Sequence, residues 1–123
     1  MANHNITIEG IDSEGHLILS DRGLGYTAGQ KTDTITWIIG PQSGVASITD
    51  IQDNSSIDVF NPNPRPFPQD PPTRADSNWR GTIRSDLTLP NPPNYVEESY
   101  SILFRRTPGG EVERHDPIIR VNP

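Results

Sequence analysis

The chain has 123 residues, a net charge of −6 and no cysteine. This length is about one domain, with room for a single hydrophobic core. The missing cysteines exclude disulfides, thiolate nucleophiles and iron–sulfur clusters, and the negative charge disfavours nucleic acid and anionic membrane surfaces as partners.

The first predicted elements are two short strands joined by a turn. Apolar and polar residues alternate over Ile6–Ile8, and His16–Leu19 is a short apolar run. Asp12–Gly15 lies between them and is rich in turn formers. A second turn is predicted at Ala28–Gln30.

The next strand, residues 34–39, is the most informative segment of the chain. Ile35, Trp37 and Ile39 are spaced two apart, with Thr34 and Thr36 between and before them, until Gly40 and Pro41 end the pattern. Because side chains alternate between the two faces of a strand, these three share one face. We expect that face in the core.

The middle of the chain predicts two weaker strands and a long connection. Residues 45–51 have apolar side chains three apart, which a β-bulge would explain, and residues 57–60 form a short apolar run. Six of the twelve residues from Asn61 to Pro72 are proline. Proline lacks an amide donor, so we expect a surface connection over about residues 61–78 and no central strand.

In the last third of the chain, apolar and polar residues again alternate with a period of two. Residues 79–87 and 99–105 predict strands, and Tyr100, Ile102 and Phe104 are expected in the core. Residues 107–110 form a tight-turn sequence because proline presets φ and glycine accepts positive φ. A final strand follows Pro117, which indicates an edge, a bulge or a strand start.

The count is about eight strands, and no window has the apolar spacing of a helix. The 13 prolines and 10 glycines also suit short strands joined by long turns. The sequence therefore predicts an all-β fold, a Greek-key β-sandwich spanning residues 1–123 as a single domain.

In this order the strands resemble a cupredoxin-like sandwich. The resemblance is carried by the Gly29–Trp37 turn and strand, the irregular middle, the Tyr100–Phe104 strand with its hairpin, and the terminal strand containing Ile119 and Val121. Copper-binding members place a histidine after the tryptophan-type strand, and a cysteine, a second histidine and often a methionine in the last hairpin. Residues 40–51 contain no histidine, and the only methionine is Met1. The resemblance therefore implies a copper-free version of the fold, with no cofactor.

Catalytic and metal sites find little support in the sequence. His4, His16 and His115 are far apart along the chain, and none has a second histidine at ligand spacing. We expect structural or solvated roles for them. The acidic loop Asp50–Asp58 could hold calcium, but its spacing fails the EF-hand pattern, so a solvated turn is favoured. His115 and Asp116 could form an acid/base pair, but no nucleophile elbow accompanies them.

The remaining candidates are aromatic residues in or beside the proline-rich breaks. Phe67, Trp79 and Tyr95 lie there with Arg80 close by in sequence, and Arg65 and Arg74 are also near. Exposed rings of this kind can bind a sugar or a partner protein. The alternative is that Trp79 and Phe67 cover the end of the sandwich.

The sequence as a whole favours a non-catalytic binding or interaction module with an unknown protein or glycan ligand. A carbohydrate-binding sandwich using Trp79 and Tyr95, and a protein that self-associates through strand edges, are the alternatives. The N-terminus has no secretory signal pattern and no segment is apolar enough to span a bilayer, so we expect a soluble protein, cytoplasmic by default. The oligomeric state is left open.

Overall fold

The computed structural model describes residues 2–20, 27–53, 58–61, 64–66, 78–89 and 94–123. Within these ranges the chain forms strands and no helix, so it has no helix that could span a membrane. The strands are β1 (Asn3–Ile11), β2 (Leu17–Leu19), β3 (Thr27–Gln30), β4 (Thr34–Ile39), β5 (Ser47–Asp53), β6 (Arg65–Pro66), β7 (Asn78–Thr82), β8 (Val96–Arg105), β9 (Glu113–His115) and β10 (Ile118–Asn122).

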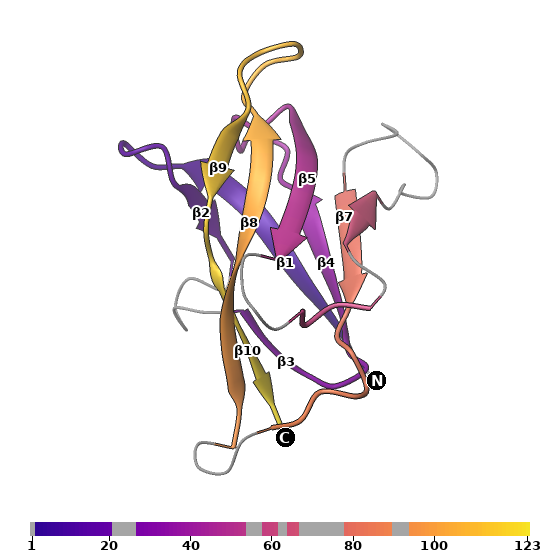
Figure 1. Ribbon diagram of the computed structural model, residues 1–123. Coiled ribbons are helices and arrows are strands. Elements are labelled where there is room, and N and C mark those ends of the chain that lie inside the picture. Colours follow the sequence, from indigo (N-terminus) through magenta and orange to yellow (C-terminus); the bar gives the residue numbers. More distant parts are fainter. Residues whose placement is uncertain (1, 21–26, 54–57, 62–63, 67–77, 90–93) are drawn as a thin grey trace.

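These strands form two mixed sheets (Figure 1). The first sheet has the order β2-β1-β4-β7-β6, and the second has the order β3-β10-β8-β5, with β9 paired to β8. Each sheet contains one parallel pair, β1 with β4 and β3 with β10. The fold is thus all-β, with two sheets arranged as in a sandwich.

The core lies between the sheets and is centred on Trp37. Its ring contacts Tyr100 of the second sheet at a centroid distance of 5.7 Å, and its indole Nε1 donates to the Tyr100 hydroxyl at 3.2 Å. A buried indole needs such a partner because an unsatisfied donor is costly. The six residues expected in the core are all buried: Ile35, Trp37, Ile39, Tyr100, Ile102 and Phe104.

Two local predictions are confirmed. The register between β5 and β8 shifts between Ile48 and Asp50, where a bulge was expected from the spacing of apolar residues. The turn after β8 closes with a hydrogen bond from Gly110 N to Thr107 O, and Gly109 has a φ of +74°. A side chain at Gly109 would be strained there.

The predicted turn at Ala28–Gln30 is wrong, because these residues belong to β3. They pair in parallel with β10, and each pairing partner is 92 residues away in sequence. Glycine suits this strand for a packing reason. A Cβ at Gly29 would lie 2.6 Å from Ile83 Cδ1, so a larger residue there would require the end of the Ile83 side chain to shift.

The strand predicted over residues 79–87 is shorter than expected. β7 ends at Thr82, Ile83 makes only an isolated bridge with Phe60, and a turn follows in which Arg84 pairs with Asp86. The strand predicted at residues 57–60 is likewise reduced to this bridge within the described residues. Leu87 is nevertheless buried.

Most of the proline-rich connection at 61–78 lies outside the described residues. Its described part includes β6, which pairs with β7 at the edge of the first sheet. An edge position tolerates Pro66, because only one side of the strand must supply hydrogen bonds.

The segment from Glu113 to Asn122 is broken at Asp116 and Pro117, where a bulge, edge or strand start was expected. β9 pairs with the C-terminal half of β8, and β10 pairs with its N-terminal half. Between these two pairings, Tyr100 N donates a hydrogen bond to Pro117 O.

Candidate functional site

Trp79 is a core residue in the structure. Its side chain lies on β7 with only 6% of the residue exposed, and its indole Nε1 donates to Ile48 O of the second sheet at 3.2 Å. A ring that is covered and already paired offers no face to a sugar. This burial counts against Trp79 as part of a ligand platform and favours the alternative that Trp79 covers the end of the sandwich.

The other predicted ligand residues do not form one surface. Tyr95 precedes β8 in the second sheet, and the Arg120 guanidinium lies over its ring at 4.2 Å from the centroid. Arg120 also pairs with Glu97. Arg80 lies on β7 in the first sheet, on the face opposite Trp79. Phe67 lies outside the described residues.

The acidic residues that suggested calcium are used in local backbone contacts. Asp50 accepts from Ile51 N, Asp53 from Val59 N and Asp58 from Phe60 N. Residues 54–57 of that loop lie outside the described residues. Among the described residues no group of three histidine or acidic side chains is placed to hold a metal ion.

His16 and His115 are 99 positions apart in sequence, but their rings lie close together in the fold. The distance between the ring centroids is 5.8 Å. Asp12 lies beside His16, and backbone hydrogen bonds from His16 and Glu14, only partly opposed by desolvation, lower the pKa of its carboxyl. Asp116 accepts hydrogen bonds from Ser101 Oγ and Arg114 Nε, which joins the β9–β10 break to β8. These contacts tie strands together at the surface.

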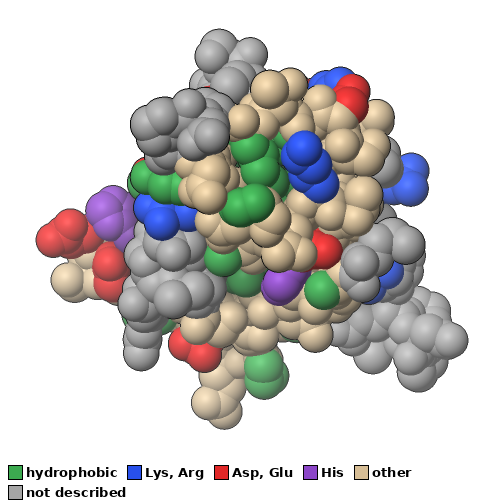
Figure 2. All heavy atoms as spheres, turned by 90° about the horizontal axis from the view of Figure 1, so that it is seen from below, with side chains coloured by type: hydrophobic (Ala, Val, Ile, Leu, Met, Phe, Trp, Pro, Cys, Tyr) green, Lys and Arg blue, Asp and Glu red, His purple; other side chains and the backbone are tan. Residues whose placement is uncertain are grey.

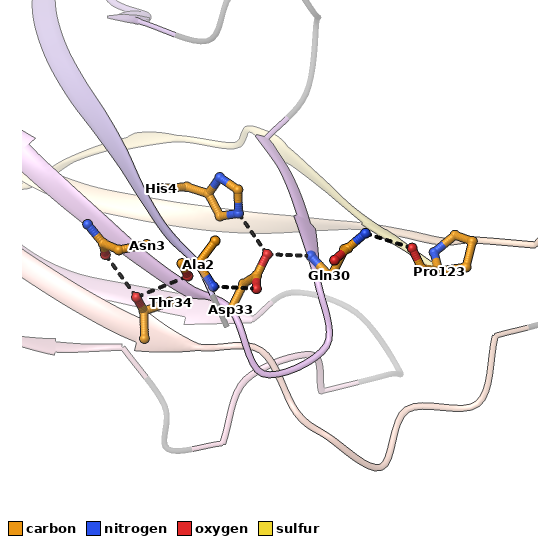
Figure 3. A network of polar contacts seen from close by, with 7 residues as sticks. All are labelled: Ala2, Asn3, His4, Gln30, Asp33, Thr34 and Pro123. Carbon is orange, nitrogen blue, oxygen red and sulfur yellow. Dashed lines mark hydrogen bonds and ion pairs between the residues drawn. The ribbon is translucent and has the colours of Figure 1, made fainter.

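At the lower end of the sandwich, His4 belongs to a compact hydrogen-bonded cluster, which we call the base network: Ala2, His4, Gln30 and Asp33. Asp33 Oδ1 accepts from Ala2 N at 2.8 Å, and Oδ2 accepts from His4 Nε2 at 2.8 Å and from Gln30 N at 3.0 Å (Figure 3). Gln30 Nε2 in turn donates to Pro123 O. The network thus joins β1, the β3–β4 turn and the end of β10.

Burial raises the pKa of Asp33, but the hydrogen bonds from His4, Ala2 and Gln30 outweigh it, and the pKa lies below its ordinary value. The carboxylate is therefore ionised and accepts three hydrogen bonds, so His4 Nε2 is the donor. Both carboxylate oxygens of Asp33 therefore already accept hydrogen bonds from groups of the protein. Seen from below, this end of the molecule shows isolated basic, acidic and histidine side chains among uncharged and apolar ones (Figure 2).

The turn that carries Asp33 is strained. Thr32 has a φ of +73°, which is rare for a β-branched residue. Hydrogen bonds from Thr32 N to Ile83 O and from Ile83 N to Asp33 O fix the turn on the first sheet. The base network holds the chain where it passes from the second sheet to the first.

The outer face of the first sheet carries a different arrangement, a line of polar side chains across four strands. Register places Asn5 opposite Thr36, Thr36 opposite Arg80 and Arg80 opposite Arg65. Ile6, Ile8 and Trp37 point to the core, so alternation places these four residues outward. We call Asn5, Thr36, Arg80 and Arg65 the polar row.

Hydrogen bonds fix the first half of the polar row. Asn3 Nδ2 donates to Asn5 Oδ1 at 2.6 Å, and Asn3 Oδ1 accepts from the hydroxyls of Thr34 and Thr36. Arg80 Nε donates to Thr36 Oγ1 at 2.9 Å. Thr36 is 4% exposed, so it is covered by its neighbours. The side-chain oxygens of Asn3, Asn5 and Thr36 thus accept hydrogen bonds from other residues of the same face.

The second half of the row places two cations side by side. Arg65 and Arg80 are directly opposite each other on β6 and β7, an arrangement that is unfavourable for like charges. The four strands of the row contain a single carboxylate, Glu9 on β1. Arg65 is exposed and has no ion pair with another residue in the part of the chain that the structure describes. Arg106, Arg114 and Arg120, by contrast, each pair with a carboxylate.

Sequence reasoning missed most of both arrangements. Among the polar row, only Arg80 was proposed as a ligand residue, and Arg65 was noted only as a neighbour of the aromatic residues. Asn3 and Asn5 do alternate with His4 and Ile6, which is a signal for an outward polar face. Their partners on β4 lie about thirty residues away, and only the parallel pairing of β1 with β4 brings them together.

Comparison with protein-family models gave no match, and comparison with curated proteins gave no significant match. The copper site of copper-binding cupredoxins does not fit this chain. The loop after β4 contains no histidine, and the hairpin residues 106–112 contain no histidine, cysteine or methionine. A blue-copper centre requires a thiolate that this sequence lacks.

Proposed function

We propose that the protein is a non-catalytic binding module, and that its ligand lies on the outer face of the first sheet. The observation that carries this proposal is the polar row, in which Asn5, Arg80 and Arg65 are held in register on a rigid sheet. Groups placed in this way lose little conformational entropy when a ligand arrives. A sheet also positions side chains more accurately than a loop does.

We further propose that the scaffold is a copper-free, cupredoxin-like sandwich with Greek-key connections. The order of elements that suggested the resemblance supports this view: β4 contains Trp37, an irregular middle follows, and β8, its hairpin and β10 close the second sheet. The two parallel pairs are compatible with it. In such a protein Trp37 is a scaffold residue.

The non-catalytic part of the proposal rests on how the ionisable groups are used. The His4–Asp33 pair resembles an acid/base pair, but its buried carboxylate accepts hydrogen bonds from three donors and fixes the N-terminal strand. Its role is therefore structural. We place the unknown ligand, a protein or a glycan, on the polar row instead.

Two alternative functions are less well supported. A glycan-binding platform made from loop aromatics would need an exposed Trp79 ring, but Trp79 is buried in the core. Self-association through sheet edges is opposed at β5, where a bulge, Asp50 and Asp53 interrupt the edge. Bulges and charges of this kind are common protections against edge pairing.

A binding screen with matched variants tests the proposal. Labelled protein is applied to arrays of glycans and of peptides, together with a double variant Asn5→Ala, Arg65→Ala and a control Arg106→Ala in the hairpin that follows β8. We expect the control to bind as the wild type does and the double variant to lose binding while keeping its circular dichroism spectrum. Equal binding by the double variant, or chemical conversion of a bound compound, would contradict the proposal.

A further inference from the structure

We infer that His16 and His115 form a binding site for a divalent transition-metal ion such as Zn²⁺ or Ni²⁺. The site contains no residue of the polar row, so it goes beyond the proposed function. His16 directly precedes β2 in the first sheet, and His115 ends β9, which pairs with β8 in the second sheet. An ion bound by both side chains would therefore link the two sheets.

The two rings lie at a distance that suits a shared ion. Their centroids are 5.8 Å apart, and their planes are tilted by 44°. Because each Zn–N bond is about 2.1 Å long, two imidazoles that bind one ion have centroids about 5–6 Å apart. His16 is exposed and His115 is half-buried, so small rotations of the side chains can turn one nitrogen of each ring toward the ion without a change in the backbone.

A carboxylate is in place to orient one of the two ligands. Asp12 Oδ2 lies 4.0 Å from His16 Nδ1, and Asp12 Oδ1 accepts hydrogen bonds from the backbone nitrogens of Glu14 and His16. Histidines that bind a metal commonly donate their second ring N–H to such a carboxylate, which leaves the other nitrogen for the ion. His16 Nδ1 thus faces Asp12, Nε2 binds the ion, and Asp12 is a positioning residue.

His115 needs only one of its ring nitrogens to bind the ion. An imidazole has two, and the second can keep a contact with another group of the protein. Binding of the ion therefore does not require either histidine to lack other partners.

The donor set decides which ions bind. Imidazole nitrogen suits Zn²⁺, Ni²⁺ and Cu²⁺, whereas Mg²⁺ and Ca²⁺ prefer oxygen ligands. With two protein ligands, water fills the remaining positions of the ion, which agrees with the finding that the described residues contain no group of three histidine or acidic side chains placed to hold a metal. The net charge of −6 favours the approach of a cation.

Isothermal titration with ZnCl₂ and with NiCl₂, in a buffer that does not bind metals, tests this inference. We expect saturable binding by the wild type, weakened at least about tenfold in both His16→Gln and His115→Gln, because each variant loses one of the two ligands. His4→Gln is the matched control, since it removes the third imidazole of the chain and leaves the site intact. It should bind the ion as the wild type does.

A further variant distinguishes an orienting role of Asp12 from a structural one. Asp12→Asn keeps the Oδ1 acceptor for the two backbone nitrogens and removes the carboxylate charge, so it should weaken Zn²⁺ binding about tenfold with little change in the unfolding temperature measured without metal. Excess Zn²⁺ should raise the unfolding temperature of the wild type and leave that of His115→Gln unchanged, because an ion that binds only the folded state stabilises it.

Three results would overturn the inference. Absence of saturable binding by folded wild type would reject the site. Equal affinity in the wild type and His115→Gln would place the ion elsewhere on the protein. A loss in His4→Gln as large as that in His16→Gln would show adventitious binding to surface imidazoles. Circular dichroism of every variant shows whether it has retained its fold.

Discussion

Three consecutive residues of β1 serve two polar arrangements with opposite properties. His4 points into the base network, whereas Asn3 and Asn5 point to the outer face. The base network is centred on a buried carboxylate with all its hydrogen bonds made inside the fold. The polar row is centred on donors, with two arginines in register at a sheet edge.

This difference suggests a structural role for the base network and a binding role for the polar row. A buried acceptor that is fully occupied stabilises the protein and has nothing left for a ligand. The polar row lies ordered on the outer face of the first sheet, and we expect it to stabilise the protein little and to contact the proposed ligand. Changes in the base network should therefore alter stability most, and changes in the polar row should alter binding with little effect on stability.

The largest effect is expected for Asp33→Ala. The substitution leaves Ala2 N, Gln30 N and His4 without their acceptor, and we expect the free energy of unfolding to fall by about 3 kcal/mol. Urea denaturation measures this change. Asp86→Ala is the control, because Asp86 is exposed and its ion pair with Arg84 lies at the surface, and it should leave the midpoint nearly unchanged. Equal losses in the two variants would mean that the base network has no special role.

The next effect is a dependence on acid. Because hydrogen bonds hold the pKa of Asp33 below its ordinary value of 3.8, its ionised form stabilises the folded state above that value. This contribution is lost as the pH falls below 3.8 and through the lower folded pKa. Unfolding free energies at pH 7 and pH 3 should therefore differ less in Asp33→Asn than in the wild type. An identical pH dependence in both proteins would contradict the assignment.

A smaller effect of opposite sign is expected at the strained turn. Thr32 has a positive φ, and glycine accepts this conformation without a steric penalty. Thr32→Gly should raise the free energy of unfolding by about 1 kcal/mol, since the relief of strain exceeds the added entropy of the unfolded chain. Differential scanning calorimetry measures the shift, and Thr88→Gly, at an exposed position, is a comparison without such strain. A loss of stability in Thr32→Gly would show that the turn is unstrained.

The smallest effect on stability is expected for the polar row. Arg65→Gln should change the free energy of unfolding by less than about 0.5 kcal/mol, because Arg65 is exposed on an edge strand. Denaturation of this variant beside Asp33→Ala compares the two arrangements directly. A large loss in Arg65→Gln would place the row among the structural parts of the fold.

The sequence predicts those features that depend on local periodicity. The Trp37 strand, the bulge in residues 45–51 and the turn at residues 107–110 are all set by neighbouring residues. β3 and β6 could not be predicted in this way, because Thr27–Gln30 and Arg65–Pro66 become strands only through partners elsewhere in the chain.

The candidate site shows the same limit more strongly. Trp79 follows a proline-rich segment, and its position in sequence cannot distinguish an exposed loop ring from a core residue that bonds to Ile48. The polar row requires the register of four strands, two of which pair in parallel. Asp33 follows a predicted turn, but its three donors come from two separate segments of the chain.

The most direct test of the central claim is a map of amide chemical shifts in ¹⁵N-labelled protein titrated with the glycan or peptide that the array screen selects. The claim is that ligand binds to the outer face of the first sheet, so the account predicts shifts that centre on Asn5, Thr36, Arg80 and Arg65, with Asp33 and Gln30 nearly unchanged. Shifts that centre instead on the hairpin at residues 106–112 or on the base network would contradict it.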